Sequence, residues 1–453
     1  MVTTGVIPVS AVPRVQEPPL LGSLGGFQDD RIGLLERIVA NHGDVAVFHF
    51  GPFPTILFNR PEFAQSVLVD QAESFDKGLI FRTALRPFLG QGLFISEDPL
   101  HRRQRKIMAP SFQPRHLAVY ADTMGAFTER AQAGWPEGQV VDIAHEMTTL
   151  TMSIIGKVLF DSDVFSEADT LGAAIGQAVR GGDYALTHLV RLPLAVPTPR
   201  NRRTTTALAL VRRHLQGLID ERRASTADRD DFLSRLLAAR DEDGQGMSDK
   251  QVSDEALTLF VAGHETTATA LAWAFYLLAQ HPEIYARLQA EVDTVLAGRT
   301  PTVADLPRLP YALQIFKETL RLYPPAYLVS RGARKASVVA GYEVPRTWGV
   351  IISIYTMHRH PEFHPDPLRF DPERFTPENE KRLPRYAYLP FGAGQRVCIG
   401  NHLATMEGQL ILAALAQRVT FELVPGQTIV PQPVITLKQR EGARMVVRRR
   451  DGA

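Results

Sequence analysis

The longest helical pattern of apolar residues in the chain runs from about residue 252 to beyond residue 278. Just before it, Ser248 and Gln251 have the spacing of a capping box, in which each side chain accepts a hydrogen bond from the other residue's backbone N–H. A helix of about 27 residues is about 40 Å long and can cross a large domain. Glu265 and Thr266 interrupt the apolar run. We expect them either to bend the helix by hydrogen bonding to its backbone or to belong to a site.

Shorter patterns with the periods of helices and strands flank this segment. Residues 74–99 hold many aromatic residues and glycines with poor periodicity, so we expect an irregular packed loop there. Residues 117–240 are mostly helical in pattern, with loops expected at 181–183 and 193–201, where glycine and proline gather. Further helices are expected at 31–41, 61–70, 282–296 and 313–322, and strands at 45–50, 55–58, 338–344, 349–354 and 428–448.

Composition and charge narrow the class of protein. The chain has 453 residues, of which 45% are hydrophobic and 22% charged, an ordinary globular balance with ample core. The net charge of +1 favours neither a nucleic-acid partner nor an anionic membrane surface. Residues 1–26 read as a flexible Pro-rich lead, with neither an apolar run of about 18 residues nor a signal peptide. The single cysteine fits a reducing cytoplasm, and we expect no membrane span.

The only cysteine, Cys398, is a small buried hydrophobe, a free thiol or a metal ligand, since it has no partner for an internal disulfide. Gly392, Gly394 and Gly400 lie close to it in sequence, together with Arg396. Glycines let a backbone come close to something flat and bulky. A helical pattern follows directly, and a helix N-terminus stabilises a thiolate. A structural cysteine explains neither the glycines nor the arginine, so the pattern favours a metal ligand.

A basic segment begins at His101, and Arg105 follows one helical turn later on the same face. Two hydrogen-bond donors on one face suit a pair of carboxylates, although a basic helix in solvent has the same pattern. Arg102, Arg103 and Lys106 fall outside this face. They would either be solvated or form a basic patch for an acidic partner protein.

The sequence around Cys398 reads F-x-x-G-x-R-x-C-x-G, which resembles the haem-binding loop of the cytochrome P-450 superfamily of haem-thiolate monooxygenases. The match includes all five fixed positions, Phe391, Gly394, Arg396, Cys398 and Gly400. The resemblance implies the cytochrome P-450 fold, mainly α with a smaller β-rich lobe, as a single catalytic domain over residues 27–453. It also implies haem b as the cofactor, with Cys398 as the proximal thiolate ligand of the iron.

The middle of the long helix resembles the oxygen-activating segment of the same family. There the resemblance implies that Ala262 and Gly263 let the helix approach the distal face of the haem. Thr266 would hydrogen-bond the bound oxygen or its water, and Glu265 would relay protons inward. A zinc-protease motif is excluded, because Ala268 stands where a second histidine would be required.

The resemblance assigns further residues to the cofactor. His101 and Arg105 match the helix that binds the haem propionates, although many members have Trp at the first position. Arg331 matches the position that reaches the other propionate. From the cysteine loop, the residues expected at the haem are Arg396, Phe391, Gly392 and Gly400.

Glu318 and Arg321 stand three positions apart on a predicted helix, which allows an ion pair. An exposed pair would contribute only ~0–1 kcal/mol, and E-x-x-R alone is a common pattern. Together with Arg374, however, the pair resembles the E-R-R triad of the family. The implied role is structural, since the triad holds the cysteine loop in place.

A substrate pocket is implied beneath residues 74–99, the lid around 181–201 and the tip of the last hairpin near 434–437. Its expected lining is apolar or aromatic, which predicts a lipophilic substrate such as a terpenoid, fatty acid, steroid or macrolide. The expected lining residues are Phe81, Leu85, Phe88, Phe94, Phe260, Val261, Tyr327, Leu328 and Ile435.

The resemblance implies a monooxygenase that inserts one oxygen atom of dioxygen into a C–H or C=C bond. No Gly-rich dinucleotide fingerprint follows a strand, so electrons are expected from a separate ferredoxin or flavodoxin with its NAD(P)H reductase. We expect a monomer. A haem-thiolate peroxygenase or sensor, and a non-haem protein with a buried cysteine, are the alternatives. The intact Glu265-Thr266 pair favours the monooxygenase.

Overall fold

The computed structural model describes residues 5–225 and 231–450. Residues 1–4 of the expected lead, residues 226–230 of the mostly helical segment and residues 451–453 of the expected domain lie outside the described part. Within that part, no helix combines the length and the apolar character needed to cross a bilayer.

The centre of the molecule is α12 (Asp249–Gln280), a helix of 32 residues. The predicted capping box is confirmed: the Ser248 hydroxyl accepts a hydrogen bond from the Gln251 N–H, and the Gln251 side chain accepts one from the Ser248 N–H. Most side chains of α12 are buried, including the fully buried Trp273 and Phe275. The helices packed around it are α8 (Ile143–Phe160), α10 (Pro199–Ala224), α14 (Pro310–Leu322) and α17 (Asn401–Arg418).

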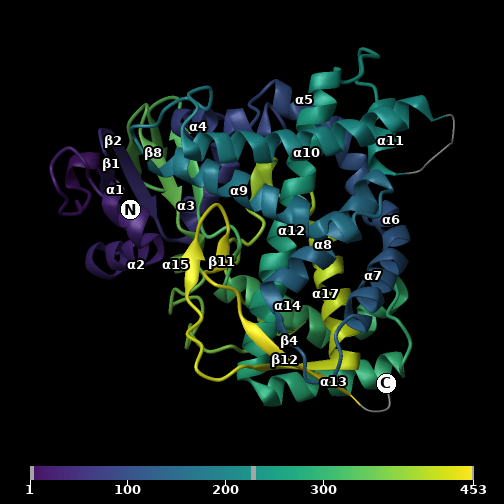
Figure 1. Cartoon of the computed structure of the whole chain (residues 1–453). Coiled ribbons are helices and arrows are strands. Elements are labelled where there is room, and N and C mark those ends of the chain that lie inside the picture. Colours follow the sequence, from purple (N-terminus) through teal and green to yellow (C-terminus); the bar gives the residue numbers. More distant parts are fainter. Residues whose placement is uncertain (1–4, 226–230, 451–453) are drawn as a thin grey trace.

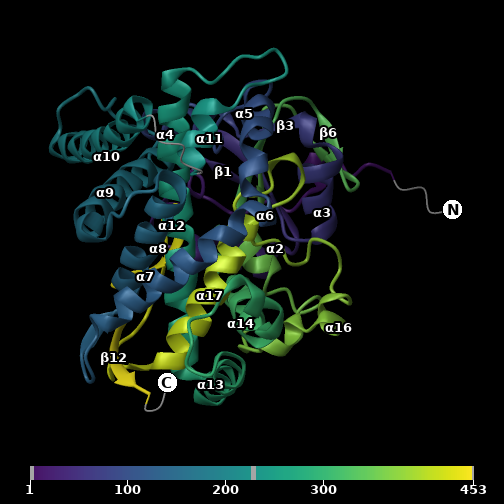
Figure 2. The same ribbon diagram turned by 90° about the vertical axis from the view of Figure 1, so that its right-hand side faces the viewer.

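Helices lie on both sides of α12. Figure 2 shows α10 and α9 (Ala168–Thr187) on one side and α14 and α17 on the other. Further helices are α1 (Leu24–Asp29), α3 (Pro61–Gln65), α5 (Leu100–Met108), α6 (Pro114–Leu117), α7 (Ala121–Ala133), α11 (Phe232–Ala238), α13 (Pro282–Leu296), α15 (Ile354–Met357) and α16 (Pro377–Glu380).

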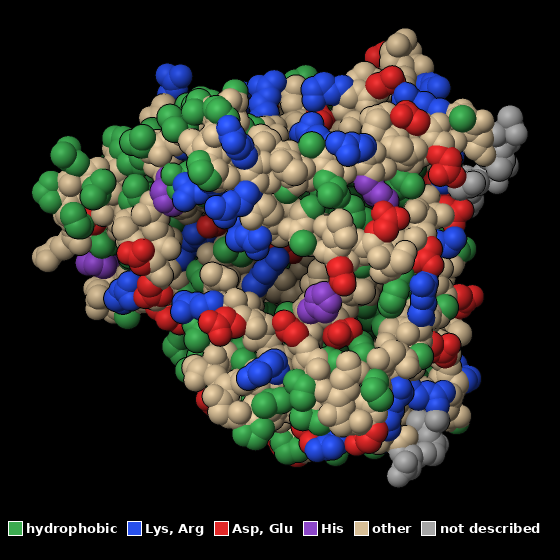
Figure 3. Space-filling view, in the orientation of Figure 1, with side chains coloured by type: hydrophobic (Ala, Val, Ile, Leu, Met, Phe, Trp, Pro, Cys, Tyr) green, Lys and Arg blue, Asp and Glu red, His purple; other side chains and the backbone are tan. Residues whose placement is uncertain are grey.

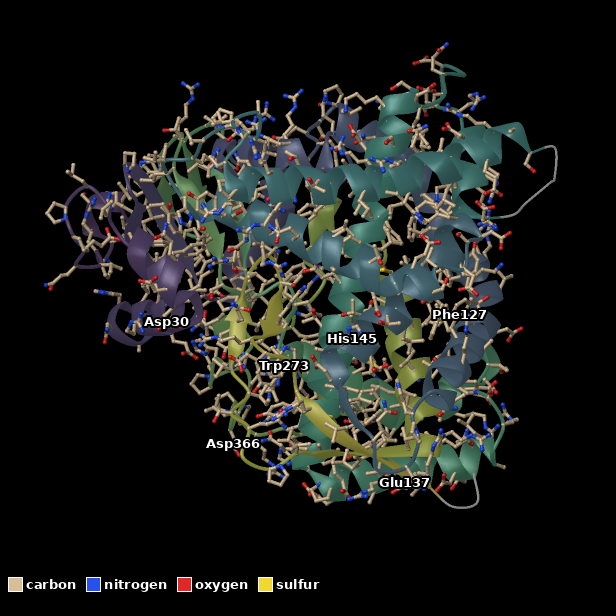
Figure 4. The ribbon with its side chains drawn as sticks, in the orientation of Figure 1. Asp30, Phe127, Glu137, His145, Trp273 and Asp366 are labelled. Carbon is tan, nitrogen blue, oxygen red and sulfur yellow. The ribbon has the colours of Figure 1, made fainter. Side chains whose placement is uncertain are left out.

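A smaller β-rich lobe lies at the left of Figure 1, beside the helix α2 (Arg31–His42), whose N-terminus is capped by Asp30 (labelled in Figure 4). Its main sheet has the order β1-β2-β8-β5-β3, in which β2 pairs with β8 in parallel and the other pairs are antiparallel. The strands are β1 (Val45–Phe50), β2 (Phe53–Phe58), β3 (Phe75–Asp76), β5 (Val329–Ala333) and β8 (Gly349–Ile352). The fold is therefore mainly α with a smaller β-rich part, as the resemblance implied.

The small remaining sheets come mostly from the C-terminal part of the chain. A three-stranded sheet has the order β4-β12-β9, and two hairpins pair β6 with β7 and β10 with β11. The strands are β4 (Val140–Asp142), β6 (Ser337–Val339), β7 (Tyr342–Val344), β9 (Val419–Leu423), β10 (Pro431–Pro433), β11 (Leu437–Gln439) and β12 (Arg444–Arg449).

The described part of the lead is held against the sheet, which differs from the flexible segment that we expected. The Val15 N–H donates to the Val47 carbonyl at 2.9 Å, and the Val47 N–H donates to the Pro13 carbonyl at 2.8 Å. This end of the molecule also exposes apolar side chains, among them Leu20 and Phe53. Figure 3 shows apolar side chains gathered over it.

Part of the segment 74–99, which we expected to be irregular, is the helix α4 (Leu79–Leu89). Ala84, Leu85 and Phe88 form its buried face at spacings of one, three and four residues. The prediction missed this helical pattern because the aromatic residues and glycines of the whole segment show poor periodicity. The prediction of a purely irregular loop was therefore wrong.

The prediction of a loop at residues 181–183 is also wrong, because the helix α9 continues through these residues. A Cβ atom on Gly181 would lie 2.7 Å from the Thr204 side chain of α10. A Cβ atom on Gly182 would lie 3.2 Å from the Ile435 side chain. The two glycines therefore allow α9 to pack closely against its neighbours, and this close approach, not a turn, explains them.

Candidate active site

The loop that carries Cys398 is closed by its own backbone. The Cys398 N–H donates to the Phe391 carbonyl at 2.9 Å, and the Val397 N–H donates to the Gly394 carbonyl at 3.1 Å. Gly394 has a φ of +68°, and a Cβ atom there would overlap the Leu68 carbonyl oxygen. This position therefore requires glycine for two independent reasons.

The sulfur atom of Cys398 stands at the end of this loop, just before α17 begins at Asn401. Burial raises the pKa of the Cys398 thiol, while the Gly400 N–H and the Arg105 guanidinium act in the opposite direction. The side chain is nevertheless accessible. An accessible thiol with a hydrogen-bond donor and a cation beside it is suited to bind a metal as the thiolate.

Five basic side chains from separate regions of the described part of the chain gather beside this loop. The charge of at least one other member lowers the pKa of Lys77, His101, Arg105 and Arg331, which means that these groups lie within electrostatic reach of one another. Arg396 acts on all four of them. The members of this cation cluster are Lys77, His101, Arg105, Arg331 and Arg396.

The pKa shifts in the cation cluster follow from burial first and mutual repulsion second. Burial and then the charges of Arg331 and Arg396 hold the pKa of Lys77 well below its usual range. Burial and then the Arg396 charge lower the pKa of Arg331 to about 10 and that of His101 to about 4. Gathering like charges is unfavourable unless an anion lies among them.

Three acidic residues balance only part of this charge. Glu97 accepts a hydrogen bond from Arg396 at 2.6 Å, and Asp98 lies 3.5 Å from His101. Asp76 acts on Arg331 and Arg396 from β3. The donors that remain suit a ligand with two carboxylates, such as the propionates of a haem. The residues present therefore fit the cofactor that the cysteine loop implies.

Lys77 is the member of the cation cluster that sequence reasoning missed. Its ammonium group lies 4.8 Å from the ring centre of Phe94 and 5.6 Å from that of Phe81. These two rings, expected in the pocket, lie 5.6 Å apart and cover the lysine. A lysine in the middle of an aromatic-rich stretch was the signal available in the sequence.

On α12, the polar residues bond back to the helix. The Thr266 hydroxyl donates to the Ala262 carbonyl at 2.9 Å, and the Thr269 hydroxyl donates to the Glu265 carbonyl at 2.8 Å. Ala262 is exposed in the middle of this otherwise buried helix, and Thr266, one turn later, is half-buried. These two residues therefore form the accessible face of the helix.

Gly263, next to Ala262, is partly exposed and also lies against α8. A Cβ atom on Gly263 would lie 2.7 Å from the Ile155 side chain of α8. The Thr151 hydroxyl of the same helix donates to the His264 carbonyl at 3.1 Å. Gly263 thus allows α12 to approach α8, and Ala262 is small and exposed beside it.

Apart from Phe81 and Phe94, which lie beside Lys77, the expected pocket residues fall into two groups. Leu85 and Ile435 meet below Gly182 of α9, with Phe88 beside Gly181. Tyr327 is buried, and its hydroxyl donates to the Val434 carbonyl at 2.8 Å at the hairpin tip.

The second group, Phe260, Val261 and Leu328, packs against the hydrophobic cores of the protein. Phe260 is fully buried, 5.8 Å from the Phe160 ring of α8 and 5.8 Å from the His264 ring. The expectation that Phe260 lines the pocket is therefore wrong, because it faces α8 and not the accessible side of α12. Val261 is partly buried and packs against the main core, and Leu328 packs against the smaller core beside α2.

The triad residues come together as expected. Glu318 and Arg321 form an ion pair, and Arg374 lies 3.5 Å from Glu318. Arg321 also donates to the His358 carbonyl at 2.9 Å. The His358 ring in turn accepts from the Leu389 N–H at 2.8 Å, nine residues before Cys398. Sequence reasoning missed this histidine link between the triad and the cysteine loop.

The basic residues that neighbour His101 and Arg105 on α5 are paired within the chain. Arg103 lies 2.6 Å from Asp241, and Lys106 pairs with Glu242. Arg102 lies 3.5 Å from Asp98. Arg103 and Lys106 are therefore less available to an acidic partner than the sequence suggested.

Comparisons with known proteins agree with this geometry. The sequence model of the family described as Cytochrome P450 matches residues 13–443. The chain is 40% identical over 403 residues to cyclooctatin synthase of Streptomyces melanosporofaciens, covering 87% of each protein. It is 38% identical to cyclooctat-9-en-7-ol 5-monooxygenase of the same organism, covering 94% of this chain and 91% of that protein. It is 35% identical to pentalenene oxygenase of Streptomyces avermitilis, covering 87% and 88%.

Solved structures show the same fold. A cyanobacterial cytochrome P450 with retinoic acid bound superposes with a TM-score of 0.87 at 27% identity, covering 97% of this chain and 99% of that one. The haem domain of cytochrome P450DA gives a TM-score of 0.88 at 26% identity, covering 99% of both chains. The family match over nearly the whole chain, the thiolate loop and the cation cluster agree, and the chain belongs to the cytochrome P450 family of haem monooxygenases.

Proposed function

We propose that this cytochrome P450 holds haem b through Cys398 and inserts one oxygen atom of dioxygen into a terpenoid. The observation that carries the proposal is the cation cluster beside the cysteine loop, which suits two propionates and is unfavourable without an anion. When bound, the haem supplies the oxygen and one-electron chemistry that protein side chains lack.

The protons come from the chain's own residues. Thr266 donates its hydroxyl hydrogen to the Ala262 carbonyl, so its oxygen remains free to accept a hydrogen bond on the accessible face of α12. Glu265 is the neighbouring acid and passes protons toward that face. Both groups must act in a site from which bulk water is largely excluded.

The relatives support a terpenoid as the substrate. The names of three relatives at 35 to 40% identity refer to cyclooctatin, cyclooctat-9-en-7-ol and pentalenene. The apolar side chains of Leu85, Phe88 and Ile435, which meet beneath α9, suit a lipophilic ligand. Electrons come from a separate ferredoxin or flavodoxin with its NAD(P)H reductase.

A ligand titration followed by the haem spin state tests this proposal. The panel contains a polycyclic terpene hydrocarbon, its monohydroxylated derivative, a long-chain fatty acid and a steroid. We expect the spin state to shift with the terpenes, and the ligand that shifts it to gain one oxygen atom when a ferredoxin system and NAD(P)H are added. A shift with the fatty acid alone would contradict the substrate class. Binding of a terpene without oxygen insertion would contradict the reaction.

A further inference from the structure

The carboxylate of Glu265 is held by the hairpin of β10 and β11 and not by its own helix. Its Oε1 atom accepts a hydrogen bond from the Thr436 hydroxyl at 2.9 Å and lies 3.0 Å from the Lys438 ammonium nitrogen. Only 7% of the Glu265 side chain is exposed. A carboxylate at such a depth requires charged or hydrogen-bonding partners, and these two residues supply them.

Lys438 differs from Thr436 in reaching the outside. Its side chain is 37% exposed, so Lys438 connects buried Glu265 with solvent. His264 is another titratable group close to this pair. It is buried, its Nδ1 atom lies 2.6 Å from the Phe260 carbonyl, and burial lowers its pKa. The neutral ring cannot replace Lys438 as the cationic partner of Glu265.

The backbone of the hairpin is fixed to α12, which sets the place of both partners. The Trp273 ring N–H of α12 (labelled in Figure 4) donates to the Leu437 carbonyl at 2.8 Å, and the Gln439 amide donates to the Ala272 carbonyl at 3.2 Å. Since alternate residues of a strand face the same side, Thr436 and Lys438 both face Glu265 while Leu437 is buried on the other side.

The tip of the same hairpin touches the expected substrate pocket. Ile435 lies below Gly182, and the Val434 carbonyl accepts from Tyr327 at 2.8 Å and from Arg31 at 3.1 Å. Arg31 also pairs with Asp183 of α9 at 2.9 Å. One short hairpin therefore contacts both the substrate pocket and the proton-carrying acid.

We propose that Lys438 is the positioning residue that holds the Glu265 carboxylate in place and supplies it with protons from solvent. The inference rests on the proposed function, since it deepens the role of Glu265. The Lys438 ammonium group gives one proton to the Glu265 carboxylate, Glu265 passes that proton inward, and a proton from solvent restores the ammonium. Only N–H and O–H bonds form and break, so charge and atoms balance.

The test compares Lys438→Met and Lys438→Arg in the haem-loaded protein. The matched control is Lys335→Met, which removes an exposed lysine that lies 3.8 Å from Glu73 on the surface. The first readout is the infrared carboxyl region of the resting protein, in which Glu265→Gln identifies the Glu265 band. The second is the solvent deuterium isotope effect on turnover and the product formed per NAD(P)H consumed.

We expect Lys438→Met to shift the Glu265 band, because the carboxyl group loses its charged partner, and to lower the product per NAD(P)H about a hundredfold, the lower end of the contribution of an acid–base group. The isotope effect should rise. Lys438→Arg should restore the position of the Glu265 band but not the product per NAD(P)H or the isotope effect, because a guanidinium keeps the charge but does not give up its proton. The carbon-monoxide and spin-state spectra should stay unchanged. An unchanged Glu265 band in Lys438→Met would overturn the pairing. Normal product formation in that variant would overturn its role in proton supply.

The infrared readout needs no turnover, so it separates this inference from the proposed function. A wild-type protein without a thiolate spectrum would overturn the proposed function, while the Glu265 band would still report whether Lys438 holds the acid. A shift of the band in the Lys335→Met control as well would show a general charge effect and would overturn the specific role of Lys438.

Discussion

Glu318 and Arg321 of α14 form a two-point ion pair with no exposed side-chain surface. The Arg321 Nε and Nη2 atoms lie 2.6 and 2.7 Å from the two carboxylate oxygens. Arg321 also donates to three backbone carbonyls, those of His358, Pro367 and Arg369. The pair thus anchors a segment that leads toward the cysteine loop, and a bidentate arginine is the residue type that can do so.

We expect Arg321→Ala to cost about 3–5 kcal/mol of unfolding free energy, because it leaves Glu318 buried without its charge partner. Thermal or denaturant unfolding measures this loss, and haem content should fall with it. Arg308→Ala is the control. Arg308 is 59% exposed and lies 3.8 Å from Asp305, so its loss should change the stability by less than about 1 kcal/mol. Equal effects of the two changes would contradict an anchoring role for Arg321.

Lys77 should contribute to haem retention in spite of its position among other cations. In Lys77→Met we expect haem to transfer to a haem-free acceptor protein about tenfold faster, equal to about 1.4 kcal/mol, since a charge-assisted bond to a propionate is lost. The exposed Arg334, which follows β5, provides the control variant Arg334→Met. A transfer rate in Lys77→Met equal to that in the control would show that Lys77 does not face the cofactor.

The pKa of His101 predicts how the protein prepared without haem responds to acid. Burial and the neighbouring cations lower this pKa from 6.5 to about 4. Above pH 6.5 the ring is neutral in both the folded and the unfolded states. As the pH falls from 6.5 to about 4, only the unfolded state binds the proton, so stability is lost over this window. His101→Asn should reduce the loss, and an identical pH dependence of unfolding in both proteins would contradict the assignment.

Two glycines in neighbouring helices should respond oppositely to alanine. In Gly217→Ala of α10 the new Cβ atom meets nothing within 4 Å, so the helix should gain up to about 1 kcal/mol from its propensity. In Gly181→Ala of α9 it would lie 2.7 Å from Thr204 and 3.0 Å from Phe88, so the overlap should outweigh that gain. Unfolding measurements on the two variants test this, and a stabilised Gly181→Ala would show that the helices are not packed closely there.

The features that could be predicted from the sequence are those formed by residues close together in the chain. The capping box of α12 depends on Ser248 and Gln251, three positions apart, and the cysteine loop lies within ten residues, so the sequence alone predicts both. The sequence does not predict contacts between residues that lie far apart in the chain. Glu265 and Lys438 are 173 positions apart in the numbering, and their pairing depends on how a hairpin docks on a helix.

The errors have the same cause. Gly181 and Gly182 look like a helix break when only their neighbours in sequence are considered, yet the side chains that require them belong to α10 and to the last hairpin. Phe260 is as apolar as a pocket residue, and only the position of α8 shows that it faces the core. Tertiary packing determines both the helix at the two glycines and the direction in which Phe260 faces, and a single sequence carries little information about tertiary packing.

The central claim is that Cys398 binds the iron of a haem as the thiolate, and the carbon-monoxide spectrum of the reduced protein tests it most directly. We predict an absorbance band at about 450 nm in the wild-type protein and its loss in a folded, haem-containing Cys398→Ser variant. A folded wild-type protein, produced with ample haem, that lacks this band would contradict the account. So would a variant that keeps the band.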